Sequence, residues 1–228
     1  MPEHDALINR MGFNNLGAES VARAIEDARA DLPEGFVVGV NIGRNRDTPE
    51  PSATDDYVAA ARAVVHACDY LTINVSSPNT PGVRDLQDPE RLVPLIDAVA
   101  AVARSRPILV KVSPDLDDER FDAVIAALLT SAVRGVVISN TTTRRDGIVG
   151  KHAAEAGGLS GAPLRDRVVA RVSRARGMAG PGLSIVASGG IASRTDAEAA
   201  RAAGADLVQL WTGMIYAGPG LIGETVRA

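Results

Sequence analysis

Residues 70–82, YLTINVSSPNTPG, combine a strand pattern with a dense run of hydrogen-bonding side chains. Residues 70–75 are mostly apolar or β-branched, which is typical of a strand in a parallel sheet covered on both faces. The polar run begins inside this strand, at Asn74, and continues through Ser77 and Asn79. These residue types are common in turns, but a turn does not explain an amide within a strand. We therefore expect residues 74–82 to carry part of a functional site.

The same strand pattern recurs along the chain. Six short apolar runs predict strands at residues 36–40, 70–75, 108–112, 135–138, 183–187 and 205–210. Helical spacing predicts helices at residues 14–30, 54–68, 89–104, 117–131 and 193–203. We expect Thr54 and Ser193 to cap two of these helices and Gly204 to end the last one. Strands that alternate with helices predict an α/β fold with a parallel sheet.

Two α/β architectures compete, the doubly wound open sheet and the (β/α)8 TIM barrel. A doubly wound sheet concentrates its site where the strand order reverses, whereas a barrel builds its site from the carboxyl ends of many strands. Nearly every predicted strand ends in small or polar residues, which favours the barrel. A closed barrel has eight strands and typically about 250 residues. The sequence therefore predicts a barrel lacking its first two βα units, as a single partial domain over residues 1–228.

Composition argues against several other classes of protein. The net charge is −4 and no run is rich in Lys or Arg, so we expect no nucleic-acid partner. One cysteine and three widely separated histidines predict neither an internal disulfide nor a metal site. No apolar run approaches the roughly 20 residues that span a bilayer.

Lysine is rare, since only Lys111 and Lys151 stand among the 24 basic residues. Lys111 lies inside a predicted strand, where a charge is costly unless it is paired. Either Lys111 has a chemical role, or its side chain extends to solvent at the strand edge.

Glycine-rich turns follow the last two predicted strands, at residues 188–191 (SGGI) and 211–213 (WTG). Glycine lets backbone N–H groups approach a phosphate, and barrels commonly bind phosphate at these two positions. Glycine also serves simple chain turning, so the pattern predicts a phosphorylated substrate or cofactor and no more. The irregular stretch between Thr143 and Gly161 is long enough to predict a lid.

Taken in order, eight motifs of the chain resemble those of dihydroorotate dehydrogenases. They are NRMGFNN (9–15), NIGRN (41–45), TINVSSPNTPG (72–82), VKVSPD (110–115), SNTT (139–142), GGLSG (157–161), SGGI (188–191) and LVQLWTG (207–213). The motif SSPN has Ser77 where another branch of the family has cysteine. In this respect the chain resembles the quinone-linked class 2 enzymes. The resemblance implies FMN-dependent oxidation of dihydroorotate to orotate in de novo pyrimidine (UMP) biosynthesis, with a quinone reoxidising the flavin.

The resemblance also implies roles for individual residues. Ser77 is the implied base, Thr80 and Phe13 beside it shape the exit of the proton, and Lys111 lies near the flavin N1/O2 edge. FMN contacts are implied for Asn41, Asn74, Lys111, Ser139, Gly161, Gly190, Trp211 and Thr212. Substrate contacts are implied for Asn9, Arg10, Met11, Gly12, Phe13, Asn74, Asn79, Asn140 and Thr141. Trp211 stands where the family more often has tyrosine, so mainly its backbone N–H is expected to touch phosphate.

The family's N-terminal region, with its quinone-binding membrane helices and first two strands, has no counterpart in this sequence. We expect this chain alone to bind FMN weakly or not at all. The resemblance implies that full-length relatives bind peripherally to the cytoplasmic side of the cell membrane through that region. We expect this chain alone to be in the cytoplasm. Two functions stay open, the dehydrogenase and a non-catalytic fragment with an incomplete flavin site. A phosphate-binding barrel isomerase explains the glycine turns but not SSPNT together with Lys111.

Overall fold

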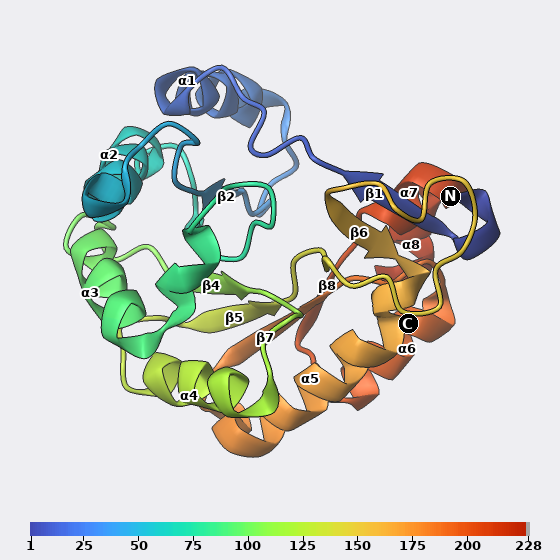
Figure 1. Cartoon of the computed structure of the whole chain (residues 1–228). Coiled ribbons are helices and arrows are strands. Elements are labelled where there is room, and N and C mark those ends of the chain that lie inside the picture. Colours follow the sequence, from blue (N-terminus) through green and yellow to red (C-terminus); the bar gives the residue numbers. More distant parts are fainter. Residues whose placement is uncertain (227–228) are drawn as a thin grey trace.

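Six strands form one parallel sheet whose strand order follows the chain (Figure 1). The computed structural model describes residues 1–226. The strands of this sheet are β2 (Gly39–Ile42), β3 (Tyr70–Asn74), β4 (Ile108–Val112), β5 (Gly135–Ile138), β7 (Ser184–Ser188) and β8 (Leu207–Gln209). Because the order β2-β3-β4-β5-β7-β8 never reverses, the sheet is not doubly wound. The predicted α/β barrel architecture with six strands is confirmed, and within the described residues the barrel is open between β2 and β8.

The helices form a ring around the outside of this curled sheet (Figure 1). They are α1 (Ala18–Ala28), α2 (Ala53–Val64), α3 (Pro89–Ala100), α4 (Asp118–Leu129), α5 (Arg165–Ala179), α6 (Arg194–Ala202), α7 (Thr212–Ala217) and α8 (Gly220–Val226). Short 3-10 helices are η1 (Pro2–His4), η2 (Arg29–Asp31), η3 (Glu50–Ser52), η4 (Val83–Gln87), η5 (Ala162–Leu164) and η6 (Gly180–Gly182). The five predicted helices are confirmed as α1 to α4 and α6, with shorter bounds than predicted.

Helix α5 is missing from the sequence prediction because its segment is rich in arginine. Its buried residues are Val168, Val172 and Ala175. Their spacing of four and three residues places them on one face of a helix. That spacing is the signal that predicts α5, although the arginines between these positions obscure it.

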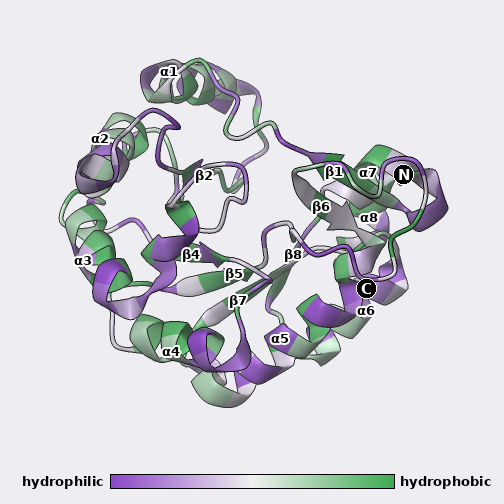
Figure 2. Cartoon of the chain, in the orientation of Figure 1, coloured by the Kyte–Doolittle hydropathy of each residue, from purple (hydrophilic) through white to green (hydrophobic). Residues whose placement is uncertain are grey.

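Alternation of side chains along the strands gives the sheet two different faces. Ile73, Val110, Val136 and Ile185 are register partners on neighbouring strands, and all are fully buried. They belong to the core between the sheet and the helices. The next residues along β3 and β4, Asn74 and Lys111, are also register partners and turn to the opposite, axial face. Figure 2 shows the hydrophobic positions gathered on the strands and on the sheet-facing sides of the helices.

The strand predicted at residues 36–40 is β2, and it begins later than predicted, at Gly39. Phe36 and Val37 are 53% and 63% exposed, so these apolar side chains are not part of the core. The ladder starts where Gly39 pairs with Tyr70, and a Cβ at Gly39 would lie 2.0 Å from the Tyr70 ring. At the other edge of the sheet, Leu207 is 61% exposed. The prediction of a sheet covered on both faces is therefore wrong at its two edges.

Beside this sheet, an antiparallel pair joins two distant parts of the chain. Strand β1 (Ala6–Asn9) pairs with β6 (Gly158–Gly161). Glycine is needed here because a Cβ at Gly161 would lie 2.2 Å from the Asp5 carbonyl oxygen. Arg10 also forms an ion pair of 2.9 Å with Glu155. The predicted irregular lid therefore ends in a strand, and the N-terminal segment anchors that end.

Ser193 caps helix α6, the helix that follows the SGGI turn. Its Oγ accepts a hydrogen bond from the Asp196 backbone N–H at 3.2 Å and donates to the Asp196 carboxylate at 2.8 Å. We expect Ser193→Ala to lower the free energy of unfolding by about 1 kcal/mol, because a helix N–H loses its acceptor. Urea denaturation followed by circular dichroism measures this change.

Thr54→Ala is the matched control for the cap. The predicted cap at Thr54 is wrong, since α2 begins at Ala53 and its N-cap, Ser52, makes no side-chain capping bond. We expect this substitution to leave the unfolding midpoint nearly unchanged. Equal losses in both variants would contradict the assignment of Ser193 as a cap.

Candidate active site

The carboxyl ends of β3, β4 and β5 meet around one cavity of about 430 Å³, here called the central cavity. Ser77 follows β3, Lys111 lies near the end of β4, and Asn140 follows β5. All three residues line the central cavity, although 63 positions separate Ser77 from Asn140 in the sequence (140 − 77). The parallel sheet brings them together because every strand ends at the same rim.

Most of the residues implied by the resemblance lie around this cavity or an adjoining one. The central cavity is lined by Asn9, Gly12, Phe13, Asn41, Asn74, Ser77, Asn79, Lys111, Asn140, Thr141 and Trp211. A smaller hollow of about 60 Å³, here called the glycine pocket, is lined by Lys111, Ser139, Asn140, Thr141, Gly161, Gly190, Trp211 and Thr212. Together they form one elongated site, because six residues line both spaces: Lys111, Asn140, Thr141, Ser188, Gln209 and Trp211.

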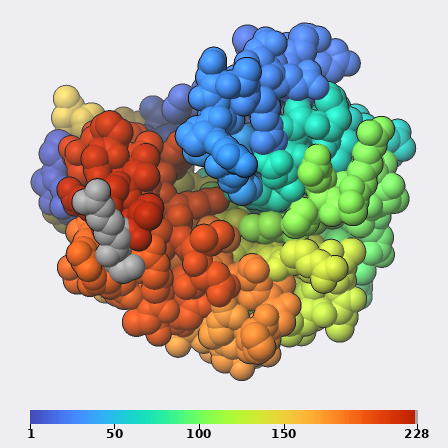
Figure 3. Space-filling view, turned by 180° about the vertical axis from the view of Figure 1, so that it is seen from behind, coloured from blue at the N-terminus to red at the C-terminus, as the bar shows by residue number. Residues whose placement is uncertain are grey.

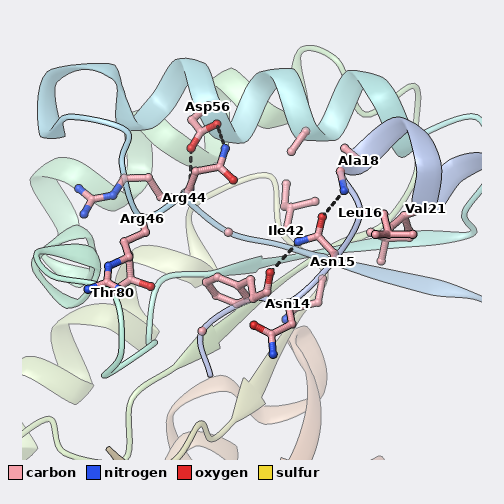
Figure 4. Close-up of a pocket in the computed structure, with 18 of the residues that line it drawn as sticks. Asn14, Asn15, Leu16, Ala18, Val21, Ile42, Arg44, Arg46, Asp56 and Thr80 are labelled. Carbon is pink, nitrogen blue, oxygen red and sulfur yellow. Dashed lines mark hydrogen bonds between the residues drawn. The ribbon is translucent and has the colours of Figure 1, made fainter. Parts of the chain in front are cut away.

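Arg10, Met11 and Thr80 lie outside both spaces. They line a cleft of about 870 Å³ between α1 and the β2–α2 segment, here called the lateral cleft (Figure 4). It adjoins the central cavity, with which it shares Gly12, Phe13, Val40, Asn41 and Asn79. Arg10 turns toward the lid to contact Glu155, and Met11 is 68% exposed. Phe13 lines both the lateral cleft and the central cavity. Viewed from behind, the surface is hollowed between the N-terminal and C-terminal parts of the chain (Figure 3).

The Ser77 side chain is buried and lies in a defined turn. Its Oγ accepts a hydrogen bond from the Asn79 backbone N–H at 3.2 Å. The Asn79 side chain reaches in turn to the carbonyl oxygen of Asn9, also at 3.2 Å. The serine turn is thus joined to the N-terminal segment, and the Ser77 hydroxyl proton stays free to point into the cavity.

Behind Ser77 lies a buried cluster of polar side chains. Asn74 Oδ1 accepts hydrogen bonds from Ser76 Oγ at 2.9 Å and from Asn140 Nδ2 at 3.3 Å. The Tyr57 hydroxyl donates to the Asn74 carbonyl oxygen at 2.7 Å, and burial raises the pKa of Tyr57. A buried amide is costly unless it is hydrogen-bonded, so this cluster fixes the orientation of Asn74 and Asn140.

Lys111 is a partly buried cation that faces both parts of the site. Burial lowers the pKa of its ammonium group to about 8. Among residues 1–226, its side chain has neither a salt-bridge partner nor a hydrogen-bond partner. Since a desolvated charge is unstable without a partner, this position favours a ligand with negative charge.

The glycine pocket depends on a glycine that no other residue can replace without strain. Gly190 has a φ of +75°, and a Cβ there would lie 2.5 Å from the Arg165 backbone. Arg165 also donates to the Gly190 carbonyl oxygen at 3.2 Å and pairs with Asp196 at 2.7 Å. Across the pocket, Thr212 Oγ1 donates to Ser160 Oγ at 2.8 Å. These contacts hold a narrow space lined by backbone groups.

Several lining residues have no individual role in the sequence prediction, although they stand within its motifs. Thr72, Ser188 and Gln209 line the central cavity on the axial face of their strands. Alternation from Asn74 predicts Thr72, and register predicts Ser188 beside Gln209. Ser160 belongs to β6, a strand that the sequence analysis misses.

Comparison with known proteins places the chain in one family. The sequence model of the dihydroorotate dehydrogenase family matches residues 1–227. A dihydroorotate dehydrogenase (quinone) of Halorhodospira halophila is 45% identical over 237 residues, which cover 100% of this chain and 68% of that protein. The protein of the same name in Xanthomonas oryzae pv. oryzae is 44% identical over 238 residues, with 100% and 67% covered.

Solved structures agree with this assignment. The crystal structure of a ligand-free dihydroorotate dehydrogenase from Eimeria tenella has a TM-score of 0.93 and 34% identity, and covers 99% of this chain and 69% of that one. The complex of dihydroorotate dehydrogenase from Eimeria tenella with ferulenol has a TM-score of 0.91 and 33% identity, with 99% and 66% covered. No helix within residues 1–226 is both long enough and apolar enough to cross a membrane. This chain belongs to the dihydroorotate dehydrogenase family, in its quinone-linked class.

Proposed function

We propose that this chain oxidises dihydroorotate to orotate, with FMN as the hydride acceptor and a quinone as the final electron acceptor, in de novo pyrimidine (UMP) biosynthesis. The observation that carries the proposal is that Ser77, Lys111 and Asn140 line one cavity. A hydroxyl, an ammonium group and an amide from neighbouring strand ends can together bind an anionic substrate and remove a proton from it. The names of the relatives support dihydroorotate and a quinone as the reactants.

The side chains of the site fit FMN. Lys111 lacks a protein partner within the described residues and would offer bound FMN a preorganised cation that stabilises negative charge. The glycine pocket beside it offers backbone groups for the phosphate end, at Gly161, Gly190, Trp211 and Thr212. Further proposed contacts are Asn41, Asn74 and Ser139. When bound, FMN supplies the acceptor for the hydride.

In this proposal, Ser77 Oγ accepts the C5 proton of dihydroorotate. A serine hydroxyl is a weak base at neutral pH, so it must pass a proton on. Phe13 borders both the central cavity and the lateral cleft, and Thr80 lines the cleft. The proton would therefore pass Phe13, whose ring cannot carry it, and leave by way of the Thr80 hydroxyl toward the lateral cleft.

The substrate's carboxylate and ring amides are proposed to bind the remaining polar groups of the central cavity. These are the side chains or backbone of Asn9, Gly12, Asn74, Asn79, Asn140 and Thr141. The implied contacts of Arg10 and Met11 are not part of the proposal. Arg10 is engaged with Glu155 at the lid, and Met11 is exposed in the lateral cleft.

The chain's single tryptophan, Trp211, lines both spaces and reports on FMN binding. We expect FMN to quench its fluorescence in a saturable way. The FMN affinity should be weak, because Trp211 is 75% exposed and the site is open between β2 and β8. Riboflavin, which lacks the phosphate, is the control ligand and should bind more weakly still.

Anaerobic addition of dihydroorotate to the FMN-loaded chain tests the reaction itself. Bleaching of the flavin absorbance band is the expected result. Quenching by FMN that never saturates, together with no bleaching at any FMN concentration, would instead favour a non-catalytic chain with an incomplete flavin site.

A further inference from the structure

We propose that Arg84 and Asp115 form a positioning pair that fixes the serine turn against the Asn140–Thr141 segment. The inference rests on the proposed function and adds two residues to it. Neither residue lines the central cavity or the glycine pocket. They act through the loops that follow β3, β4 and β5, and join these three loops behind the site.

Arg84 lies on η4 and makes three hydrogen bonds in three directions. Its Nε donates to the Ser76 carbonyl oxygen at 3.2 Å, and one Nη donates to the Thr141 carbonyl oxygen at 3.0 Å. The other Nη pairs with the Asp115 carboxylate at 2.8 Å. A planar guanidinium can hold three acceptors at fixed angles, whereas the ammonium group of lysine offers a point charge on a flexible stem.

Asp115 extends the same connection to the start of the lid. Its carboxylate accepts hydrogen bonds from the Thr143 backbone N–H at 2.9 Å and from the Thr142 hydroxyl. Arg167 of α5 approaches it at 3.3 Å. Burial alone raises the pKa of Asp115, but the hydrogen bonds from Thr142 and Thr143 and the charge of Arg84 outweigh it and hold the pKa below its usual range. Asp115 is therefore charged at neutral pH, and Arg84 and Arg167 together compensate its charge.

A second side chain of η4 holds Arg84 in place. Gln87 is almost completely buried, and its Nε2 donates to the Arg84 carbonyl oxygen at 3.0 Å. Its Oε1 accepts a hydrogen bond from the Ser113 backbone N–H at 2.7 Å. The short helix is thus fixed to the loop after β4, and Arg84 cannot follow the serine turn if that turn moves.

The chemical consequence follows from the neighbours of these contacts. Ser76 precedes the proposed base, and its Oγ accepts a hydrogen bond from Asn140 Nδ2 at 3.0 Å. Arg84 holds the backbone of Ser76 and of Thr141, the residue after Asn140. Displacement of a reacting group by about 1 Å can cost about 100-fold in rate. Loss of Arg84 should therefore slow the reaction without removing any group that touches the substrate or FMN.

Arg84→Gln and Arg84→Lys, in the FMN-loaded chain, test the positioning role. We expect Arg84→Gln to lower the rate constant of flavin reduction by dihydroorotate by about 10- to 100-fold. FMN affinity, measured by Trp211 quenching, should change by less than about threefold, because no FMN contact is removed. Arg84→Lys should recover little of the rate, since one ammonium group cannot bridge the three acceptors.

Tryptic cleavage gives a readout that needs no activity. The lid contains Arg144, Arg145 and Lys151, which are sites for trypsin. Because Asp115 holds Thr142 and Thr143, Arg84→Gln should speed cleavage in the lid several-fold. Arg174→Gln is the matched control, since it removes an arginine that pairs with Asp118 and Asp122 on α4 and not with a residue of the three rim loops. It should change neither the reduction rate nor lid cleavage.

The outcomes separate this inference from the proposed function. Wild-type rates of both reduction and lid cleavage in Arg84→Gln would overturn the inference, as would full rescue of the rate by lysine. Faster lid cleavage with an unchanged reduction rate would also overturn it, by leaving Arg84 a purely structural role. If dihydroorotate does not reduce FMN bound to the unsubstituted chain, the proposed function fails. The rate of tryptic cleavage in the lid then decides by itself whether Arg84 joins the loops.

Discussion

Replacing Ser77 with alanine should lower the rate of flavin reduction by dihydroorotate by about 10²- to 10⁴-fold, the range expected for loss of a general base. The hydroxyl lies in the central cavity, and its Oγ is held by the Asn79 N–H, so alanine removes the proposed proton acceptor with little change in shape. FMN binding should stay near normal, because Ser77 does not line the glycine pocket. Anaerobic stopped-flow absorbance measures the reduction rate, and Trp211 quenching measures binding.

Ser77→Cys is the informative companion variant. A thiol has a pKa near 8.5 and can accept a proton as thiolate. We expect this variant to retain more of the rate than alanine and to gain rate as the pH rises toward about 8.5. Unchanged reduction kinetics in Ser77→Ala would remove Ser77 from the role of base.

Lys111→Met should act on FMN affinity and on stability in opposite directions. It removes the cation proposed to face the flavin, so FMN should bind about 10- to 100-fold more weakly, the cost of a lost charged hydrogen bond. The apo chain should become more stable by about 3 kcal/mol at pH 7, because a desolvated charge without a partner disappears. Quenching titrations and urea denaturation measure the two effects.

The lowered pKa of Lys111 fixes the sign of the pH dependence. In the folded chain the pKa is about 8, below its unfolded value of 10.5. At Lys111 the unfolded state therefore binds more protons between these two values, and the contribution of Lys111 to stability rises with pH across that window. FMN affinity should fall as the pH rises above about 8, since the ammonium group loses its proton. Both trends should vanish in Lys111→Met.

A normal FMN affinity in Lys111→Met would leave only a structural role for this lysine. It would favour a side chain that extends along the strand to solvent. The gain in stability would then also be small, since a solvated ammonium group carries little desolvation cost.

The sequence by itself determined the elements whose patterns are local. The apolar runs of β3, β4, β5 and β7 pack against the helices that cover the outer face of the sheet, so their own residues predict them. The sequence also placed Asn74 and Lys111 near the carboxyl ends of two strands. That they share a face follows from the register of the β3–β4 pair, which belongs to the tertiary structure. Most of the implied residues that line the central cavity came from the family resemblance of the motifs, not from periodicity.

Only the tertiary structure decided features that depend on distant partners. Phe36 and Val37 are apolar but lie beyond the ladder with β3, so β2 begins at Gly39. Strand β6 exists because residues 158–161 meet residues 6–9, a pairing with no local signal. Arg84 and Asp115 stand 31 positions apart, and only the meeting of three loops at one rim joins them. Hydrogen bonds between loops depend on where strands end in space, and periodicity carries no information about that.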